Sequence, residues 1–310
     1  MDKAMKSTRP RVALVKTDYE RLVSQMDRVF ALGEAPDPAA KNRTVVIKIN
    51  LCDARTPETG AVTHPRFLDA LLGYLRERHA DLSITVVESD SLVVLADEFI
   101  RWFGILPVLN KWNARFVNLS RDGLVPTKID GAALKEISIP ATLAQGSYFI
   151  SLAKLKTNLL TKITASLKNQ FGCLPDLDKN RHHPRIHDVV VDVNQALRPD
   201  FAIVDGIVAM GGVQGPAFGI PIPAGLVISG RDLVAVDSCC AEVMGLRPSS
   251  IAHIRKAKAR GLGSTRFERV GDPPGDTDFL MSPWQMRIFT VGSAIKKRTM
   301  NKSRRKGAEL

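Results

Sequence analysis

The segment from Phe149 to Gly172, FISLAKLKTNLLTKITASLKNQFG, places lysine, threonine and asparagine directly after an apolar run. Tyr148–Leu152 is apolar and short, which is typical of a buried strand. Lys154 and Lys156 follow it, where the carboxyl ends of parallel strands open into the crevice that holds ligands in open α/β sheets. The segment therefore predicts an anion-binding crevice, although such lysines also suit a solvated helix face.

The second half of this segment indicates a helix. If Leu160–Gln170 is helical, Thr161, Ala165 and Lys168 fall on one face and present a hydroxyl and an ammonium together. We expect Lys156 and Lys168 to share one anion, because they flank the turn between strand and helix. The substrate-binding side chains predicted on this side of the crevice are Lys48, Asn50, Lys154, Lys156, Lys168 and Asn169.

Strand and helix patterns alternate along the rest of the chain, which predicts an α/β fold: a mainly parallel sheet with helices on both faces. A possible insertion at 115–140 is expected to hold a small β excursion through Val125–Ile129 and Leu134–Ile139. We expect residues 1–265 to form one domain and 266–310 a C-terminal extension. The other expected strands are 11–16, 44–49, 83–88, 201–204 and 224–229, and the other helices 19–32, 65–78, 97–103, 186–197, 232–244 and 248–260.

A second group of polar residues is expected to face the lysines. Asp205 ends the apolar strand Phe201–Val204, and we interpret it as a catalytic carboxylate, although Asp205-Gly206 also suits a hairpin turn. Gln214 lies in the glycine-rich loop that follows, which fits a ligand-facing loop or a plain connection. Asp237, in the predicted helix 232–244, completes the group as a substrate-binding residue.

The histidine-rich loop Arg181–His187 offers groups for proton transfer. His182 and His183 are the predicted catalytic residues, because imidazole titrates near neutral pH and the neighbouring Lys179 favours an anion. A metal site and an ordinary surface loop are the alternatives. No acidic partner has the spacing of a tetrahedral site, so no metal ligand is assigned.

The four cysteines, Cys52, Cys173, Cys239 and Cys240, contain no C-x-x-C pair. Such spacing predicts neither a disulfide framework nor an iron–sulfur cluster held by this chain alone. No apolar run approaches the roughly 20 residues of a membrane span, and the N-terminal segment lacks the apolar core of a secretory signal. We therefore expect a cytoplasmic protein whose cofactor is unknown.

Charge is concentrated at the C-terminus of the chain. Lys296–Lys306 carries seven of the positive charges and no acid, within a formal net charge of +12. Such a tail attracts nucleic acid or anionic membranes weakly and in a salt-dependent way, and it also suits a purely solubilising role.

Several motifs in order resemble the family known as domain of unknown function 362, over about residues 44–263. They are Lys48-Ile49-Asn50, Thr63-His64-Pro65, Leu155-Lys156-Thr157-Asn158, TASLKNQFG at 164–172, Val204-Asp205-Gly206, Gly215-Pro216 and Ala235-Val236-Asp237. Members often carry ferredoxin-like clusters, so the resemblance implies redox-linked work, here with an external redox partner. Asn158 stands where many members have histidine, which weakens a metal or acid–base role at that position.

Two functional hypotheses follow. The first is a cytoplasmic enzyme that binds a small carboxylate or phosphate in the lysine-rich crevice. The second is a noncatalytic binding protein whose basic tail contacts nucleic acid or membrane. Deleting the tail distinguishes them, because only the second depends on it.

Overall fold

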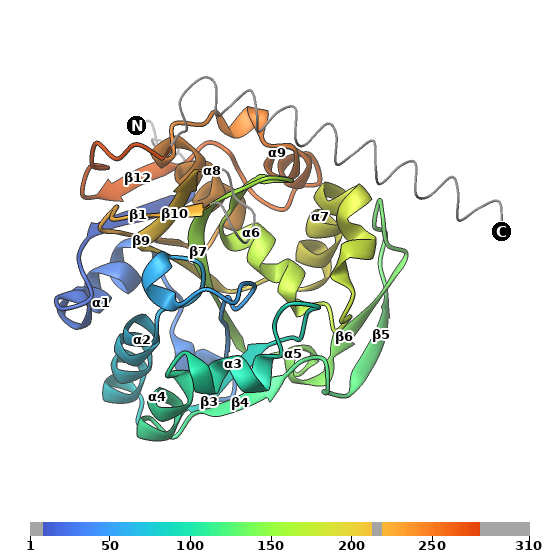
Figure 1. The fold of residues 1–310 in the computed structure, drawn as a ribbon, viewed down its shortest axis with the longest axis horizontal. Helices are drawn as coiled ribbons and strands as arrows, with labels where there is room; N and C mark the ends of the chain where they lie inside the picture. The colour runs from blue at the N-terminus through green and yellow to red at the C-terminus, as the bar shows by residue number, and fades with distance from the viewer. Residues whose placement is uncertain (1–8, 213–218, 280–310) are drawn as a thin grey trace, which may run out of the picture.

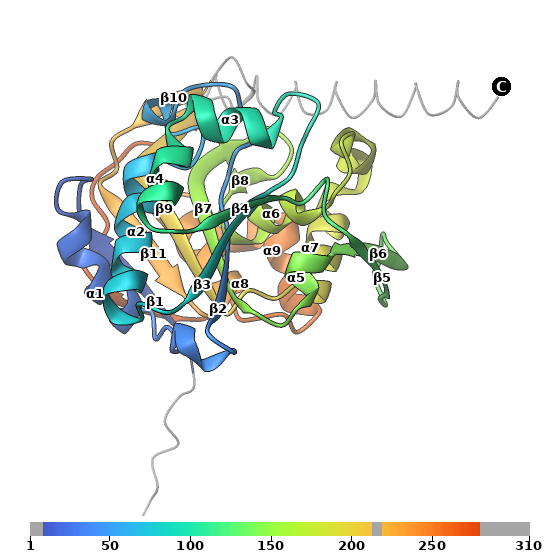
Figure 2. The same ribbon diagram turned by 90° about the horizontal axis from the view of Figure 1, so that it is seen from below.

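The structure is a computed structural model that describes residues 9–212 and 219–279. One large sheet forms its centre, and a separate two-stranded sheet lies at its side (Figures 1 and 2). The strands of the large sheet are β1 (Arg11–Lys16), β2 (Thr44–Lys48), β3 (Ser83–Glu88), β4 (Arg115–Asn118), β7 (Tyr148–Asn158), β8 (Lys162–Thr164), β9 (Phe201–Gly212), β10 (Gly219–Ile222), β11 (Leu226–Gly230) and β12 (Glu268–Gly271).

The strand order is β12-β1-β11-β9-β7-β2-β3-β4, with β8 paired to β7 and β10 to β9. The run β9-β7-β2-β3-β4 is parallel, as is the pair β1/β12. Strand β11 is antiparallel to both its neighbours, and β8 and β10 form hairpins. The predicted α/β fold with a mainly parallel sheet is confirmed.

Helices cover both faces of the sheet (Figure 1). One face carries α1 (Leu22–Leu32), α2 (Pro65–Arg78), α3 (Ala96–Trp102) and α4 (Ile105–Lys111). The opposite face carries α6 (Ser166–Asn169), α7 (Ile186–Ala196), α8 (Leu233–Val243) and α9 (Ala252–Ala259). The remaining helix is α5 (Ala141–Ala144), and the short 3-10 turns are η1 (Pro38–Ala40), η2 (Pro57–Thr59), η3 (Gln170–Cys173), η4 (Lys179–Arg185) and η5 (Pro248–Ser250).

Strand β7 supplies side chains to both cores. Ile150 and Leu152 pack in the core beneath α1 and α2, whereas Phe149 and Ala153 pack in the core beneath α7 and α8. This alternation follows from the two-residue period of a strand. Both faces are covered, which explains the uninterrupted apolar run that begins this strand.

Several predicted boundaries agree with the structure, because local signals set them. Strands 11–16 and 83–88 and helix 65–78 have the predicted ends. Pro65 occupies the first turn of α2, and the ring of His64 accepts a hydrogen bond from the backbone N–H of Arg66.

The predicted helix Leu160–Gln170 is wrong. Strand β7 runs on to Asn158 and turns into β8, so that Lys156 pairs with Thr164. Lys162 has a left-handed φ of 67°, which a continuous α-helix does not permit. Helix α6 therefore begins only at Ser166, and Thr161 and Lys168 do not share a helix face.

Strand β9 also continues beyond its predicted end, so Asp205 lies within a strand and not at its carboxyl end. The predicted β excursion is present as β5 (Leu124–Lys128) paired with β6 (Glu136–Pro140), whereas β4 belongs to the large sheet. The sheet extends past residue 265, because β12 pairs with β1. The basic tail 296–306 lies outside the described residues.

Candidate functional site

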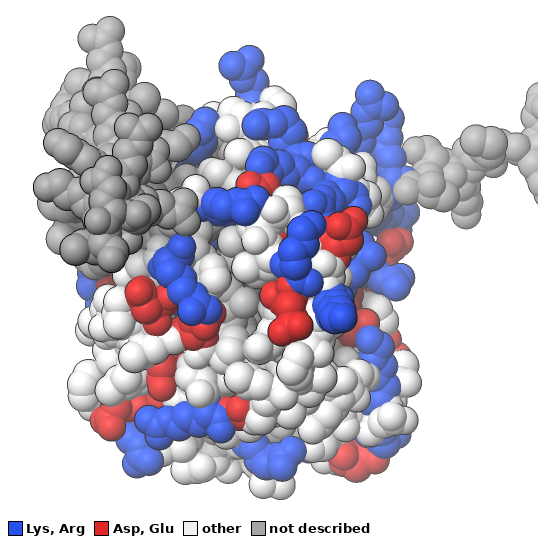
Figure 3. Space-filling view, turned by 90° about the vertical axis from the view of Figure 1, so that its right-hand side faces the viewer, with Lys and Arg blue, Asp and Glu red and all other residues white. Residues whose placement is uncertain are grey.

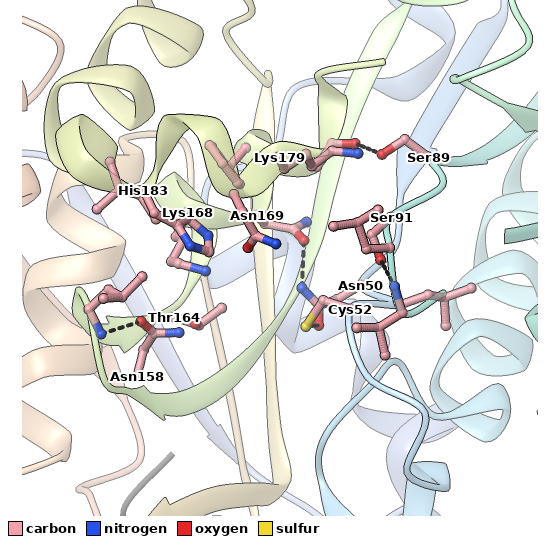
Figure 4. Close-up of a pocket in the computed structure, with 18 of the residues that line it drawn as sticks. Asn50, Cys52, Ser89, Ser91, Asn158, Thr164, Lys168, Asn169, Lys179 and His183 are labelled. Carbon is pink, nitrogen blue, oxygen red and sulfur yellow. Dashed lines mark hydrogen bonds between the residues drawn. The ribbon is translucent and has the colours of Figure 1, made fainter. Parts of the chain in front are cut away.

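A pocket of about 330 Å³ lies where β2 and β3 end, between the β7–β8 hairpin, α6 and η4 (Figure 4). This is the carboxyl edge of the parallel strands, where the sequence predicted a crevice. Its polar lining consists of Lys48, Asn50, Cys52, Glu88, Ser89, Ser91, Asn158, Thr164, Lys168, Asn169, Lys179, Asn180 and His183.

Lys48 and Glu88 form a buried ion pair beside the pocket, with 2.6 Å between Nζ and Oε1 and side chains 1% and 5% exposed. Lys48 also donates to the carbonyl of Ile49, and Glu88 accepts from the backbone N–H of Leu51 and of Ser89. Both charges are therefore compensated within the protein, so this pair shapes the pocket wall.

Asn50 and Asn169 join the end of β2 to α6. The Nδ2 of Asn50 donates to the Oδ1 of Asn169 at 3.0 Å, and Asn169 donates to the Lys48 carbonyl and to the Ser151 hydroxyl. Both predicted residues line the pocket, as expected. Their amides also hold the backbone around it in place.

Lys168 supplies a cation to the pocket whose charge the described chain does not neutralise. Within residues 9–212 and 219–279 no hydrogen bond or ion pair engages its ammonium, which lies 6.0 Å from the centre of the Phe171 ring. Burial lowers the pKa of Lys168 to about 8; Cys52 opposes this effect, and Lys156 adds to it. An anion bound in the pocket would stabilise the protonated form of Lys168 and so raise its pKa again.

Lys179 is a second pocket cation. It donates to the carbonyls of Asp90 (2.5 Å) and Asp176 (2.7 Å). Burial lowers its pKa to about 8, and the carboxylate of Glu88 counteracts part of that effect. Because an ammonium has three donors, one remains for a ligand.

The two predicted catalytic histidines have different surroundings. His183 lines the pocket and lies beside Lys168 in the close-up (Figure 4). His182 is outside the lining and its Nε2 is 3.2 Å from the carboxylate of Asp176. Both rings pack near Phe171, at centroid distances of 6.1 Å and 6.3 Å. His183 is therefore the better placed of the two for contact with a ligand.

Lys154 and Asp205 lie away from this pocket. They are register partners on β7 and β9, and their side chains form a fully buried ion pair at 2.8 Å. The hydroxyl of Tyr19 donates to Asp205 at 3.2 Å, and Lys154 also donates to the carbonyl of Val208. Lys154 points to the α1 and α2 side of the sheet because it continues the two-residue spacing of Ile150 and Leu152.

Lys156 is buried next to the pocket without lining it. Its ammonium donates to the side-chain oxygen of Asn50 (2.8 Å), the carbonyl of Ala61 (2.6 Å) and the sulfur of Cys52 (3.0 Å). Within the described chain it reaches the pocket through Asn50 and Cys52, and the sharing of one anion by Lys156 and Lys168 stays a prediction.

Asp237 holds the start of α6 in place through hydrogen bonds. From α8 it accepts hydrogen bonds from the backbone N–H of Ser166 (2.8 Å) and Leu167, and from the Ser166 hydroxyl (2.5 Å). It thereby satisfies donors at the start of α6, the helix that carries Lys168. Gln214, the last predicted substrate-binding residue, lies outside the described residues.

Sequence reasoning missed Glu88 and gave Cys52 no role in the site. Glu88 ends the apolar strand β3, so the criterion applied to Asp205, a carboxylate directly after an apolar run, would have identified it. Cys52 is exposed, whereas the remaining cysteines, Cys173, Cys239 and Cys240, are buried. No group of three or more metal-ligating side chains occurs in the part of the chain that the structure describes.

The surface shows a concentration of positive charge. Figure 3 presents the right-hand side of Figure 1, and Lys and Arg side chains gather over its upper part with Asp and Glu among them. Helix α9 carries Arg255, Lys256 and Lys258, of which Lys256 pairs with Asp188 at 2.5 Å.

Comparison with known proteins identifies the family. Residues 45–242 match the family described as domain of unknown function (DUF362). The chain belongs to this family. A thylakoid-associated protein of Synechocystis sp., sll1697, is 26% identical to this DUF362 protein over 190 residues, which make up 59% of this chain and 58% of that protein. The chain thus spans less than two thirds of the length of that relative.

Two solved structures are similar to this DUF362 protein at low identity. The lactate racemase apoprotein from Thermoanaerobacterium thermosaccharolyticum has a TM-score of 0.45 and 13% identity, covering 76% of this chain and 57% of that one. A protein from Thermotoga maritima has a TM-score of 0.43 and 13% identity, covering 75% and 61%. Among the described helices, none combines the length and apolar character that crossing a bilayer requires.

Proposed function

We propose that this DUF362 protein is a cytoplasmic enzyme that binds a small carboxylate or phosphate in the pocket at the ends of β2 and β3. The observation that carries the proposal is Lys168, a pocket-lining cation that no carboxylate of the described chain neutralises. Lys179 supplies a second charge at the same cavity. Two ammonium groups beside one cavity favour an anionic ligand.

Groups suited to proton transfer accompany these charges. A lysine whose pKa is about 8 exchanges protons readily at neutral pH, and His183 lies beside it. We therefore assign Lys168 and His183 as the candidate acid–base groups. The redox-linked role and the external redox partner implied by the family resemblance stay predictions.

The anion proposal is tested by titrating the full chain with phosphate, sulfate and acetate near pH 7 and measuring affinity by calorimetry. Lys168→Met should weaken binding by roughly tenfold to a hundredfold, because a hydrogen bond to a charged group contributes about 1.5–3 kcal/mol. Lys128→Met is the matched control, since Lys128 is exposed on β5. Equal affinities in both variants and the wild type would refute the proposal.

The alternative, a noncatalytic protein that binds nucleic acid or membrane, is supported by the charge of Lys296–Lys306 and by the basic surface in Figure 3. Removing residues 296–310 separates the two functions. A tail-driven binder loses its salt-dependent affinity for nucleic acid or anionic vesicles, whereas the pocket keeps its affinity for small anions.

A further inference from the structure

The pocket has an apolar part as well as a polar one. Six leucine and valine side chains line it in addition to the groups described above: Leu51, Leu92, Val93, Leu159, Leu160 and Leu177. Leu92 and Val93 belong to the loop that follows β3, and Leu177 belongs to the loop that precedes η4. Their exposed fractions are 59% for Leu92, 55% for Val93 and 50% for Leu177.

Such exposure is confined to few places on this protein. Nine large apolar residues of the described chain are strongly exposed, and three of the nine belong to this one pocket. Covering water-exposed apolar side chains with an apolar part of a ligand lowers the free energy of the complex and so favours binding. The exposed positions of Leu92, Val93 and Leu177 place this apolar surface at the mouth of the pocket.

Part of the polar lining lies deeper, and Lys168 is half-buried. The Lys48–Glu88 pair is buried, and Asn50 and Asn169 are 5% and 2% exposed. Figure 4 shows Lys168 and Asn169 across the cavity from Ser91, the residue that precedes Leu92 and Val93. A volume of about 330 Å³ falls at the lower end of the roughly 300–1,000 Å³ that is usual for small-molecule sites.

We infer that the ligand is an amphipathic anion: a carboxylate or phosphate head at Lys168 and an aliphatic or aromatic chain against Leu92, Val93 and Leu177. This inference rests on the proposed function and specifies its substrate class. Lys168 is half-buried and these apolar side chains are exposed, which favours a bound ligand with its head inside the pocket and its chain at the mouth.

The test is a homologous series of straight-chain carboxylates, acetate, butanoate, hexanoate and octanoate, titrated into the full chain by calorimetry. Each methylene that reaches the apolar mouth should raise affinity by up to about fourfold, because burying one completely contributes on the order of 0.8 kcal/mol. An affinity that does not change with chain length would overturn the inference while leaving anion binding intact.

Variants assign the effect to the proposed surfaces. The double change Leu92→Ser and Leu177→Ser should flatten the dependence on chain length, whereas Lys168→Met should lower every affinity and leave that dependence unchanged. Leu124→Ser is the matched control, because Leu124 is also 50% exposed but lies on β5, outside the pocket lining. Equal chain-length dependence in the double variant and the control refutes the inference. If no carboxylate or phosphate binds, the proposed function itself fails.

Discussion

Replacing Asp205 by asparagine should destabilise the protein strongly, because it removes one partner of the buried pair with Lys154. Both side chains are fully buried and their charged atoms are 2.8 Å apart. The new amide can still accept from the backbone N–H of Ile207, but its NH₂ group cannot accept from the lysine. Removing one partner of such a pair costs about 3–5 kcal/mol.

The pH dependence makes this prediction sharper. Burial already lowers the pKa of Lys154. In the variant the amine avoids an unpaired buried charge by losing its proton, which costs roughly 1.4 kcal/mol for each pH unit below its usual pKa. With the ordinary pKa of 10.5 as the reference, deprotonating Lys154 costs about 5 kcal/mol at pH 7 and about 2 kcal/mol at pH 9. The stability lost by Asp205→Asn cannot exceed these values. The loss of stability should therefore shrink as the pH rises.

Urea denaturation of the wild type and Asp205→Asn at both pH values measures this penalty. Adding Lys154→Met to the Asp205→Asn background should recover much of the lost stability, because it removes the unpaired amine. Asp18→Asn is the control, because its ion pair with Arg21 is exposed and should contribute little to stability. A penalty below about 1 kcal/mol for Asp205→Asn at pH 7, or no recovery in the double variant, would contradict this account.

Two other predictions concern titratable side chains. Burial and the neighbouring His253 lower the pKa of His187 to about 4, from an ordinary value of 6.5. Between pH 6.5 and pH 4 the histidine is protonated in the unfolded chain but not in the folded chain. Protonation therefore favours unfolding, and the urea midpoint should fall as the pH drops through this range. His187→Phe should reduce that slope; an unchanged slope would contradict the assignment. Iodoacetamide should alkylate Cys52 before the three buried cysteines of the native protein, as read by mass spectrometry, because the reagent can reach an exposed side chain without local unfolding. Alkylation of a buried cysteine as fast as that of Cys52 would contradict this prediction.

Local sequence patterns predicted the fold class and many of the element boundaries. The strand of residues 83–88 and the helix that begins at Pro65 have their predicted limits, since apolar period and helix caps act within a few residues. The pocket edge was also predicted, because polar residues after apolar strands gather at one edge of a parallel sheet. Lys48, Asn50, Lys168 and Asn169 line the cavity as expected.

Sequence reasoning was less successful where the partners of a charge come from distant parts of the chain. Lys154 was predicted to bind substrate, but the register between β7 and β9 sets it opposite Asp205. A lysine in a local pattern resembles a solvated or ligand-binding residue whether or not a carboxylate lies beside it in the fold. The contact between Asp237 and Ser166 likewise depends on the packing of α8 against α6, and the substrate-binding role of Asp237 stays a prediction.

The sequence by itself determined the alternation of strands and helices, the concentration of cations in residues 154–168 and the family to which the chain belongs. Only the tertiary structure decided which cations are neutralised: Lys48 by Glu88 and Lys154 by Asp205, with Lys168 left facing the pocket. The physical reason is that strand period and helix caps are properties of neighbouring residues. Burial and charge pairing depend on strand register and layer packing, which join residues far apart in the chain.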